Sequence, residues 1–588
     1  MSTSTTTSPL RPTRSDATIA DSPPSKRQRR DPNENAILKL TGDEWLMVFD
    51  NLRDQDPWFL SRLCLVSRAF HTLATPLLYR SVVLPRRLDD LTRDPDGLLC
   101  RLLSDSHMQL RAHVQELTVP QTAASYSMGQ RDDFEDRDYV AQLVEHLPNL
   151  RRVRVMHPLP LTDRYIDSFE DHPNNPELHI LAFQGWEKTP SRSLNFVSTI
   201  KASLLRERQR LQTGNDNLPS MMLNFQMLFF SCPNLKSCSL TMFGPFENPD
   251  ALATFEMTGE EIFPRLESLS LNGYFIRPNE WPHWRDRFSW SSLSSLEVGP
   301  QPELTDRLLQ KLKGHTTSLK RFKITVWTGE DEAAAQEHLE GFLYGFDSLE
   351  TLEITNFVCP VEAMANHRNL VRLAVHLGEE WDSEEVIPSW NASDIDYLDD
   401  NCPNLEVLEI DFERQYGAWD DELLISVAKG FDCLRELCLH VRVGSVRGED
   451  PPLTPVLNYQ SAREIGSTFF KARKHSFDYY RSRMPNQKLD QLERISLKTG
   501  VDWHLYNRFD GDQTVEELNK NTFELRKPTC DTGKLILVHT ERDKIEAQNR
   551  QGYPGATAEK TKSVICAGEI GALHEDYLGS IKISTQPE

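Results

Sequence analysis

Between residues 114 and 497 the chain repeats the pattern Leu-x-x-φ-x-φ, in which φ is an apolar residue. The spacing of apolar and polar positions predicts short strands with one buried face, and the intervals leave room for a helix after each strand. Two intervals, 178–235 and 434–492, are about twice as long as most others, so each predicts a degenerate repeat or an insertion. The twelve matches begin at Val114, Leu150, Leu178, Leu235, Leu266, Leu293, Leu319, Leu349, Leu370, Leu405, Leu434 and Leu492.

A shared lead-in strengthens this interpretation. In six units an apolar residue, then Pro or Asp, and one more residue come directly before the leading Leu. An apolar residue that anchors a helix end, followed by a residue that favours a turn, is the expected approach to a strand. The six apolar residues are Leu147, Cys232, Phe263, Phe346, Cys402 and Phe431.

The first ordered segment is predicted to be a group of three short helices. Thr41 and Glu44 have the spacing of a capping box, and Asp56 with Pro57 marks the start of a second helix. The first helix is predicted to present an apolar face of Trp45, Val48, Phe49 and Leu52. The second is predicted to carry Leu60, Leu63, Val66 and Phe70. A third helix is expected over 71–78, followed by a strand over 81–84.

These residues resemble an F-box. The runs Leu63-Cys64-Leu65-Val66-Ser67-Arg68-Ala69-Phe70 and Pro76-Leu77-Leu78-Tyr79-Arg80 carry the resemblance, whereas Thr41-Gly42 replaces the Leu-Pro that is usual in the family. The resemblance implies that the three helices bind a Skp adaptor and through it a cullin. The residues expected at the adaptor, some of which must instead form the small core, are Leu40, Trp45, Leu46, Phe49, Leu60, Leu63, Val66 and Phe70.

The repeats resemble the irregular leucine-rich repeats of F-box proteins. The resemblance implies a solenoid whose concave sheet holds a protein substrate. Alternation along the strands places polar side chains on that sheet, so a binding face is one interpretation. The other is that neighbouring charges, such as Lys323 and Glu353, only neutralise each other across strands. The candidate face comprises Arg321, Lys323, Glu353, Arg372, His376, Glu409, Asp411, Glu436 and His440.

The expected fold class is therefore α/β: a small N-terminal three-helix F-box followed by an irregular leucine-rich-repeat solenoid with a parallel sheet on its concave face. Four parts are expected. Residues 1–35 form a disordered tail, 36–84 the F-box, 85–500 the solenoid and 501–588 a C-terminal cap with a partly disordered tail. Within the last part, 534–540 and 581–584 are predicted strands.

Charge is distributed unevenly along the 588 residues. The formal net charge is −22, which argues against a general binder of nucleic acid or of anionic membranes. Residues 377–422 hold sixteen Asp or Glu and one Arg, a net of −15. This stretch either docks a basic segment of a substrate or forms a solvated acidic loop and helix.

No catalytic, cofactor-binding or metal-binding motif stands out, because the phosphate-binding, nucleophile-elbow and metalloprotease patterns are all absent. No apolar run is long enough to span a bilayer. We expect a protein of the cytoplasm or nucleus, with the basic run 26–30 as a weak import signal.

The combined resemblance predicts a non-catalytic substrate-recognition subunit of a Skp-cullin-F-box ubiquitin ligase. The alternative is a non-ligase interaction scaffold with a weak or repurposed F-box. An enzyme in the last 90 residues is a third hypothesis.

Overall fold

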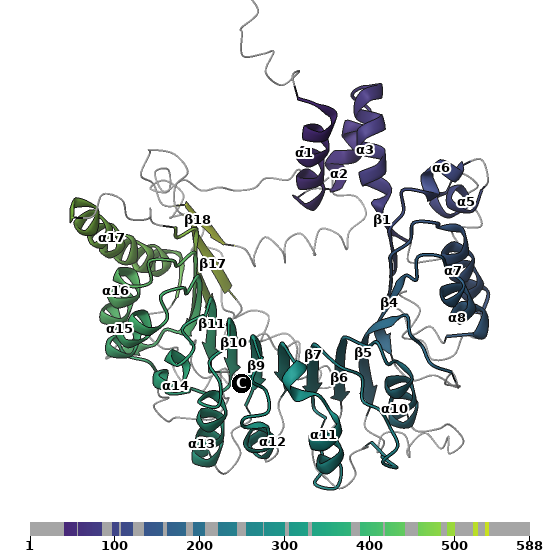
Figure 1. Cartoon of the computed structure of the whole chain (residues 1–588). Helices are drawn as coiled ribbons and strands as arrows, with labels where there is room; N and C mark the ends of the chain where they lie inside the picture. The colour runs from purple at the N-terminus through teal and green to yellow at the C-terminus, as the bar shows by residue number, and fades with distance from the viewer. Residues whose placement is uncertain are drawn as a thin grey trace, which may run out of the picture. The chain divides into compact units, whose positions relative to one another are not determined.

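The computed structural model describes most of the chain between residues 40 and 539 (Figure 1). The described ranges are 40–55, 57–84, 97–104, 107–120, 134–156, 161–183, 192–205, 221–243, 255–274, 276–299, 305–326, 332–377, 389–415, 418–441, 457–483, 491–499, 521–526 and 536–539. The basic run 26–30, Asp56 and the predicted strand 581–584 lie outside them.

The chain divides into two compact units, one ending at Ser81 and the other beginning at Val82. This division falls three residues before the end of the segment that the sequence predicts as the first folded part. We call these parts the three-helix unit and the sheet unit.

The three-helix unit contains α1 (Gly42–Gln55), α2 (Pro57–Leu63) and α3 (Arg68–Arg80). The predicted capping box at α1 is confirmed: the Thr41 amide donates to Glu44 Oε2 at 2.7 Å, and the Glu44 amide donates to Thr41 Oγ1 at 3.3 Å. Ser67 caps α3 by accepting a hydrogen bond from the Phe70 amide at 3.1 Å. The third helix therefore starts before the predicted residue 71, and Phe70 belongs to it.

The core of this unit is small. Phe49, Leu60 and Ala74 are its fully buried members, and Trp45 and Phe70 pack against them with their ring centroids 4.9 Å apart. Other partly buried contributors are Leu52, Leu63, Cys64, Leu73, Leu77 and Leu78. Val48 and Val66 are 38% and 66% exposed and lie outside this core. The prediction that the second helix carries Val66 and Phe70 was wrong, because α2 ends at Leu63.

The sheet unit is a mixed α/β structure with one mostly parallel sheet. Among the described residues, sixteen strands form this sheet in chain order. The strands from β2 to β16 pair in parallel, whereas β17 and β18 pair antiparallel at the end. The sheet strands are β1 (Ser81–Val83), β2 (Glu116–Val119), β3 (Arg152–Val155), β4 (Glu177–Phe183), β5 (Val197–Leu205), β6 (Ser237–Phe243), β7 (Ser268–Asn272), β8 (Ser295–Val298), β9 (Arg321–Thr325), β10 (Thr351–Thr355), β11 (Arg372–His376), β12 (Val407–Asp411), β15 (Glu436–Val441), β16 (Arg494–Thr499), β17 (Asn521–Arg526) and β18 (Ile536–His539).

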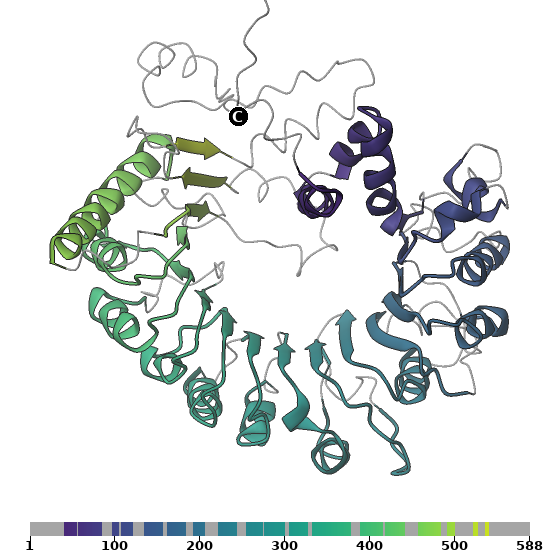
Figure 2. The same cartoon turned by 45° about the horizontal axis from the view of Figure 1, so that its top comes forward.

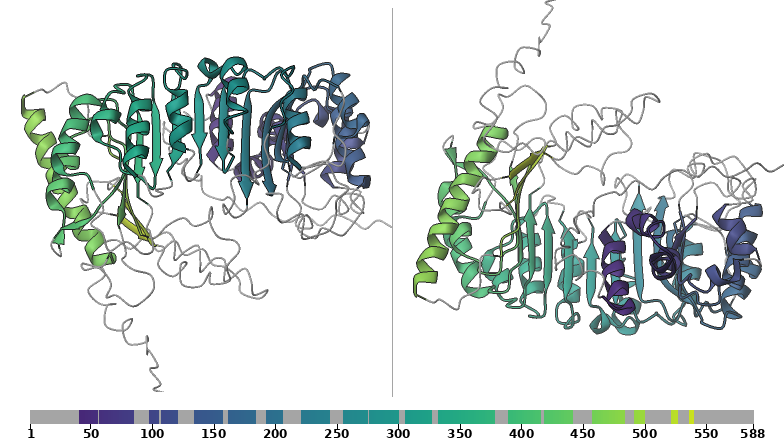
Figure 3. Two further views of the ribbon diagram at one scale, coloured as in Figure 1. Left: turned by 90° about the horizontal axis from the view of Figure 1, so that it is seen from below. Right: turned by 90° about the horizontal axis from the view of Figure 1, so that it is seen from above.

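Helices cover one side of this row of strands and leave the other side open (Figures 2 and 3). We call the uncovered side the open face. The helices of this unit are α5 (Leu98–Leu103), α6 (Met108–Arg111), α7 (Phe134–His146), α8 (Asp163–Glu170), α10 (Met221–Ser231), α11 (Trp281–Arg287), α12 (Thr305–Leu312), α13 (Glu332–Leu343), α14 (Val361–Ala365), α15 (Ala392–Asn401), α16 (Asp421–Lys429) and α17 (Tyr459–Arg483). A small hairpin of β13 (Arg414–Gln415) and β14 (Ala418–Trp419) lies between β12 and α16.

The repeated apolar residues form the layer between sheet and helices. Leu319, Phe322 and Ile324 are each 0% exposed, and the corresponding residues of the other repeats are buried as well, except Leu181, which is partly buried. Burying one such side chain contributes roughly 1.5 to 3 kcal/mol, so the repeats build a continuous core. The six lead-in residues are all buried as well, as expected for helix-end anchors.

Eleven of the twelve predicted starts lie two residues before a strand, which confirms the pattern there. Leu178 is the exception, because β4 begins at Glu177. The gap after Leu178 contains β5. This strand does not match the leucine pattern because its pairing with β4 has an irregular register. Leu178 pairs with Val197 but His179 pairs with Thr199, so Ser198 is an extra residue in β5.

The second long gap contains α17, a helix of 25 residues. Of the C-terminal predictions, the strand at 534–540 is confirmed by β18, whereas β17 was not predicted. Among the described residues, no helix has both the length and the apolar composition needed to cross a membrane.

Candidate functional site

The nine residues of the candidate face lie on β9, β10, β11, β12 and β15, which are neighbours in the sheet. The strand register brings residues of neighbouring strands side by side: Lys323 of β9 pairs with Glu353 of β10, and Thr355 of β10 pairs with His376 of β11. Along β9 the buried residues alternate with exposed or half-buried ones, which places Arg321 and Lys323 on the open face.

A chain of ion pairs runs across the first part of this face. Lys323 Nζ lies 3.5 Å from Glu297 and 3.9 Å from Glu353, while Arg372 lies 2.9 Å from Glu353 and 3.2 Å from Glu409. The expectation that these charges neutralise each other is therefore confirmed for Lys323, Glu353 and Arg372. Exposed pairs of this kind contribute little stability, so their main effect is to balance charge.

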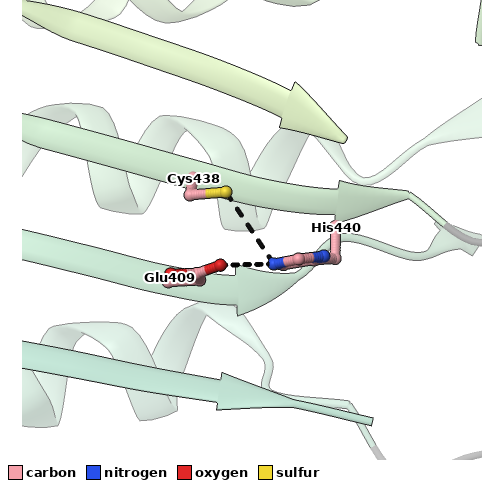
Figure 4. Close-up of side chains that lie close together, drawn as sticks. All are labelled: Glu409, Cys438 and His440. Atoms are coloured by element: carbon pink, nitrogen blue, oxygen red, sulfur yellow. Dashed lines mark hydrogen bonds and ion pairs between the residues drawn. The ribbon is translucent and has the colours of Figure 1, made fainter. Parts of the chain in front are cut away.

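Glu409 is the centre of a second cluster (Figure 4). Its Oε1 lies 2.7 Å from His440 Nε2 and 3.0 Å from Lys498 Nζ. Burial would raise the pKa of Glu409, but the hydrogen bond from His440 and the charge of Lys498 hold it well below its usual range. Glu409 is therefore ionised, and Nε2 of His440 must carry the proton that it shares with Glu409.

His376 and Asp411 extend this cluster. His376 Nδ1 lies 2.5 Å from Asp411 Oδ1, and the Leu377 amide donates to Asp411 Oδ2 at 2.6 Å. The rings of His376 and His440 stack with their centroids 3.8 Å apart. Burial lowers the pKa of His440, so this ring is neutral at pH 7.

Cys438 lies beside these groups, and with Glu409 and His440 it forms the one set of three among the described residues that could hold a metal ion. Two contacts compete with that role. His440 Nε2 is used by Glu409, and Lys498 bonds both Glu409 and the Cys438 thiol. A metal needs a thiolate and a free imidazole nitrogen.

The same geometry disfavours a nucleophilic thiol. Cys438 Sγ lies 3.8 Å from His440 Nε2, the nitrogen that already faces Glu409 (Figure 4). In a catalytic triad the carboxylate and the nucleophile contact opposite nitrogens of the imidazole. The cluster is therefore a hydrogen-bonded part of the open face.

Sequence reasoning did not select four charged or polar members of this face: Glu297, Cys438, Arg494 and Lys498. Arg494 pairs with Glu436 at 2.6 Å and lies 4.0 Å from Glu524. The signal was available, because Glu297 and Lys498 follow the predicted starts Leu293 and Leu492 at open-face positions of the repeat.

The predicted adaptor residues divide between core and surface. Phe49 and Leu60 are 1% and 0% exposed, so they are among the selected residues that form the small core: both side chains fill the centre of the three-helix unit. Leu40 and Val66 are exposed, whereas Trp45, Leu46, Leu63 and Phe70 are partly buried.

The three-helix unit also exposes large apolar side chains that were not selected. Trp58 is 77% exposed and Leu65 is 87% exposed, at α2 and at the turn after it. A small helical unit on its own cannot bury several large side chains at once. The exposed apolar set of this unit, which we call the apolar set, is Leu40, Met47, Val48, Trp58, Phe59, Leu65 and Val66.

Several described acids of the stretch 377–422 make internal bonds. Asp394 completes a capping box with Asn391 on α15, and Asp420 caps α16. Asp399 Oδ1 accepts the Phe431 amide at 2.6 Å, and Asp396 accepts the Ser426 hydroxyl. The bonds of these described acids favour a structural role for the stretch over a role as a docking site for a basic segment.

Comparison with known proteins gives no relative: no protein-family model and no curated protein matches the chain.

Proposed function

We propose that this chain is a substrate-recognition subunit of a Skp-cullin-F-box ubiquitin ligase. The three-helix unit would act as the F-box and the sheet unit as an irregular leucine-rich-repeat solenoid. The single observation that supports this most is the apolar set, since a unit of about 40 residues with a core this small gains most by binding a partner.

The proposed division of labour needs no catalytic side chain in this chain. The adaptor would bury the apolar set, and the open face would hold a protein substrate near a conjugating enzyme recruited elsewhere in the complex. Rate enhancement then comes from proximity and orientation.

Co-expression with a Skp adaptor tests this proposal. Trp58→Asp combined with Leu65→Asp places charges in the apolar set, and we expect the adaptor to be lost from the purified chain. Both positions are exposed, so the variant keeps its fold, whereas Asp at the buried Phe49 would unfold the unit.

Asn51→Asp combined with Thr72→Asp is the matched control, because both residues are exposed and polar on α1 and α3. We expect this control to co-purify with the adaptor as the unchanged chain does. Failure of the unchanged chain to co-purify at micromolar concentration would contradict the proposal and favour the alternative of a scaffold outside a ligase.

A further inference from the structure

One continuous row of paired residues crosses the open face from β3 to β9. Its two ends are arginines, and one His and four hydroxyl residues lie between them. Each member pairs with the next, so the row is continuous across seven strands of the curved sheet (Figure 2). In order, the row is Arg154, His179, Thr199, Ser237, Ser268, Ser295 and Arg321.

Three cations on this part of the face make no ion pair with a described residue. They are Arg154 and Arg321 of the row, and Lys201, which lies two residues beyond Thr199 on β5; all three are exposed. The other basic side chains of the open face do have partners. These are Arg152, Lys323, Arg372, Arg494 and Lys498, each within 4.0 Å of a carboxylate.

The acidic groups nearby do not compensate these charges. Glu116 pairs with Arg152 at 3.0 Å, and Glu297 accepts the Ser270 hydroxyl at 2.8 Å besides contacting Lys323. Glu177 pairs with Lys236 at 2.8 Å and lies 3.7 Å from His179 of the row. The described open face from β3 to β9 therefore carries unneutralised positive charge, although the whole chain has a formal charge of −22.

A pocket adjoins the row where β4, β5 and β6 begin. It has a volume of about 630 Å³, and its lining includes Phe169, Phe196, Glu170 and Glu177. Ser198 at its wall lies 3.3 Å from His179 of the row. Arg265, which also lines the pocket, makes no ion pair with a described residue.

We propose that the row from Arg154 to Arg321, together with Lys201, binds an extended acidic segment of a protein partner. This inference rests on the proposed function and names its substrate class. Carboxylates or phosphates of the segment would pair with the three cations, the hydroxyls would donate hydrogen bonds, and the pocket would receive a neighbouring side chain.

The dimensions suit a short peptide. Six strand spacings of about 4.8 Å separate β3 from β9, a span of about 29 Å, which an extended segment of about nine residues covers. Asp or Glu side chains and phosphorylated Ser or Thr share the required anionic chemistry, so the experiment needs one probe for each source.

Fluorescence anisotropy of labelled nine-residue peptides with the full chain tests the proposal. The three probes are Glu-Gly-Ser repeated three times, the same peptide with phosphoserine in place of each Glu, and a neutral peptide with Gln in place of each Glu. We expect at least one anionic peptide to bind, more weakly at high salt, and the neutral peptide to bind at least about tenfold less tightly.

Arg154→Glu combined with Arg321→Glu reverses both ends of the row, and we expect it to weaken the anionic peptide by about tenfold or more. Lys313→Glu combined with Lys471→Glu makes the same charge change at exposed positions at the end of α12 and on α17, and we expect an affinity within about twofold of the unchanged chain. Equal binding of neutral and anionic peptides, absence of binding by both anionic peptides, or equal losses in the two variants would overturn the proposal. Adaptor co-purification is measured separately, so either proposal can fail alone.

Discussion

At the scale of single residues, the structure places several ionisable groups where burial shifts their protonation. Glu280 is 2% exposed next to α11, and its Oε2 accepts the Tyr274 hydroxyl at 2.7 Å. Burial raises the pKa of Glu280 to about 7. The surrounding aromatic residues, including Trp284 and Trp290, are buried against the core, so this region is structural.

Glu280 gives a prediction about pH. Its folded pKa of about 7 lies above the unfolded value of 4.5, so its contribution to stability is present below pH 4.5 and is lost as pH rises through 7. We expect Glu280→Gln to remove this loss. The quantity compared is the free energy of unfolding of the variant minus that of the unchanged chain. This difference should be about 2 to 3 kcal/mol larger at pH 8 than at pH 5.

Urea unfolding at the two pH values measures this difference, with Glu260→Gln at an exposed position as the control. An identical effect of Glu280→Gln at pH 5 and pH 8 would show that the carboxyl does not titrate in this range.

His367 gives a prediction of the opposite sign. It is 0% exposed, and burial lowers its pKa to about 4, below the unfolded value of 6.5. Its neutral form therefore supports the fold above pH 6.5, and stability is lost as pH falls from 6.5 towards 4. We expect His367→Gln to reduce the fall in melting temperature between pH 7 and pH 5. His315→Gln, at an exposed position, is the control, and equal pH profiles for the two variants would contradict the prediction.

At the scale of elements, single side chains fasten one repeat to the next. Arg473 of α17 is 1% exposed, and its guanidinium donates to the carbonyl oxygens of Ala428, Gly430 and Phe431 at 3.3 to 3.5 Å. These carbonyls lie at the C-terminal end of α16, where a helix leaves acceptors without intrahelical partners. Arg473 thereby joins α17, which lies within the second long gap, to α16, which precedes it.

We expect Arg473→Ala to lower the free energy of unfolding by about 2 to 4 kcal/mol, because buried carbonyls lose their donor and a cavity remains. Lys471→Ala, at an exposed position on the same helix, should change it by less than about 0.5 kcal/mol. Comparable losses in the two variants, measured by urea unfolding, would refute this role of Arg473.

Elements also show how far sequence reasoning reaches. The leucine pattern locates eleven strands because each of these strands begins at a fixed number of residues after the first residue of its repeat, which is buried. It misses β5 because the extra residue Ser198 breaks that offset. It also misjudges the three-helix unit, since the partition of apolar residues between core and surface depends on how the three helices pack. The Ser67 cap was a readable signal that α3 begins before residue 71.

At the scale of the whole molecule, charge is sorted between parts of the sheet unit. The open face from β10 to β16 balances its charges through Arg372, Glu409 and Lys498, while the part from β3 to β9 keeps three cations that make no ion pair with a described residue. The sequence identified the first part by its alternating charges. It did not identify the row from Arg154 to Arg321, because pairing across seven strands becomes visible only in the sheet register.

In the proposed function the three-helix unit recruits ligase components and the sheet unit recruits a substrate. Affinity capture of the full chain from cells in which ubiquitin turnover is blocked tests this division, with Trp58→Asp and Leu65→Asp combined as the comparison. We expect the Skp adaptor and cullin to be captured by the unchanged chain and lost from the variant, while other partners are kept. Equal capture of adaptor and cullin by both chains would contradict it.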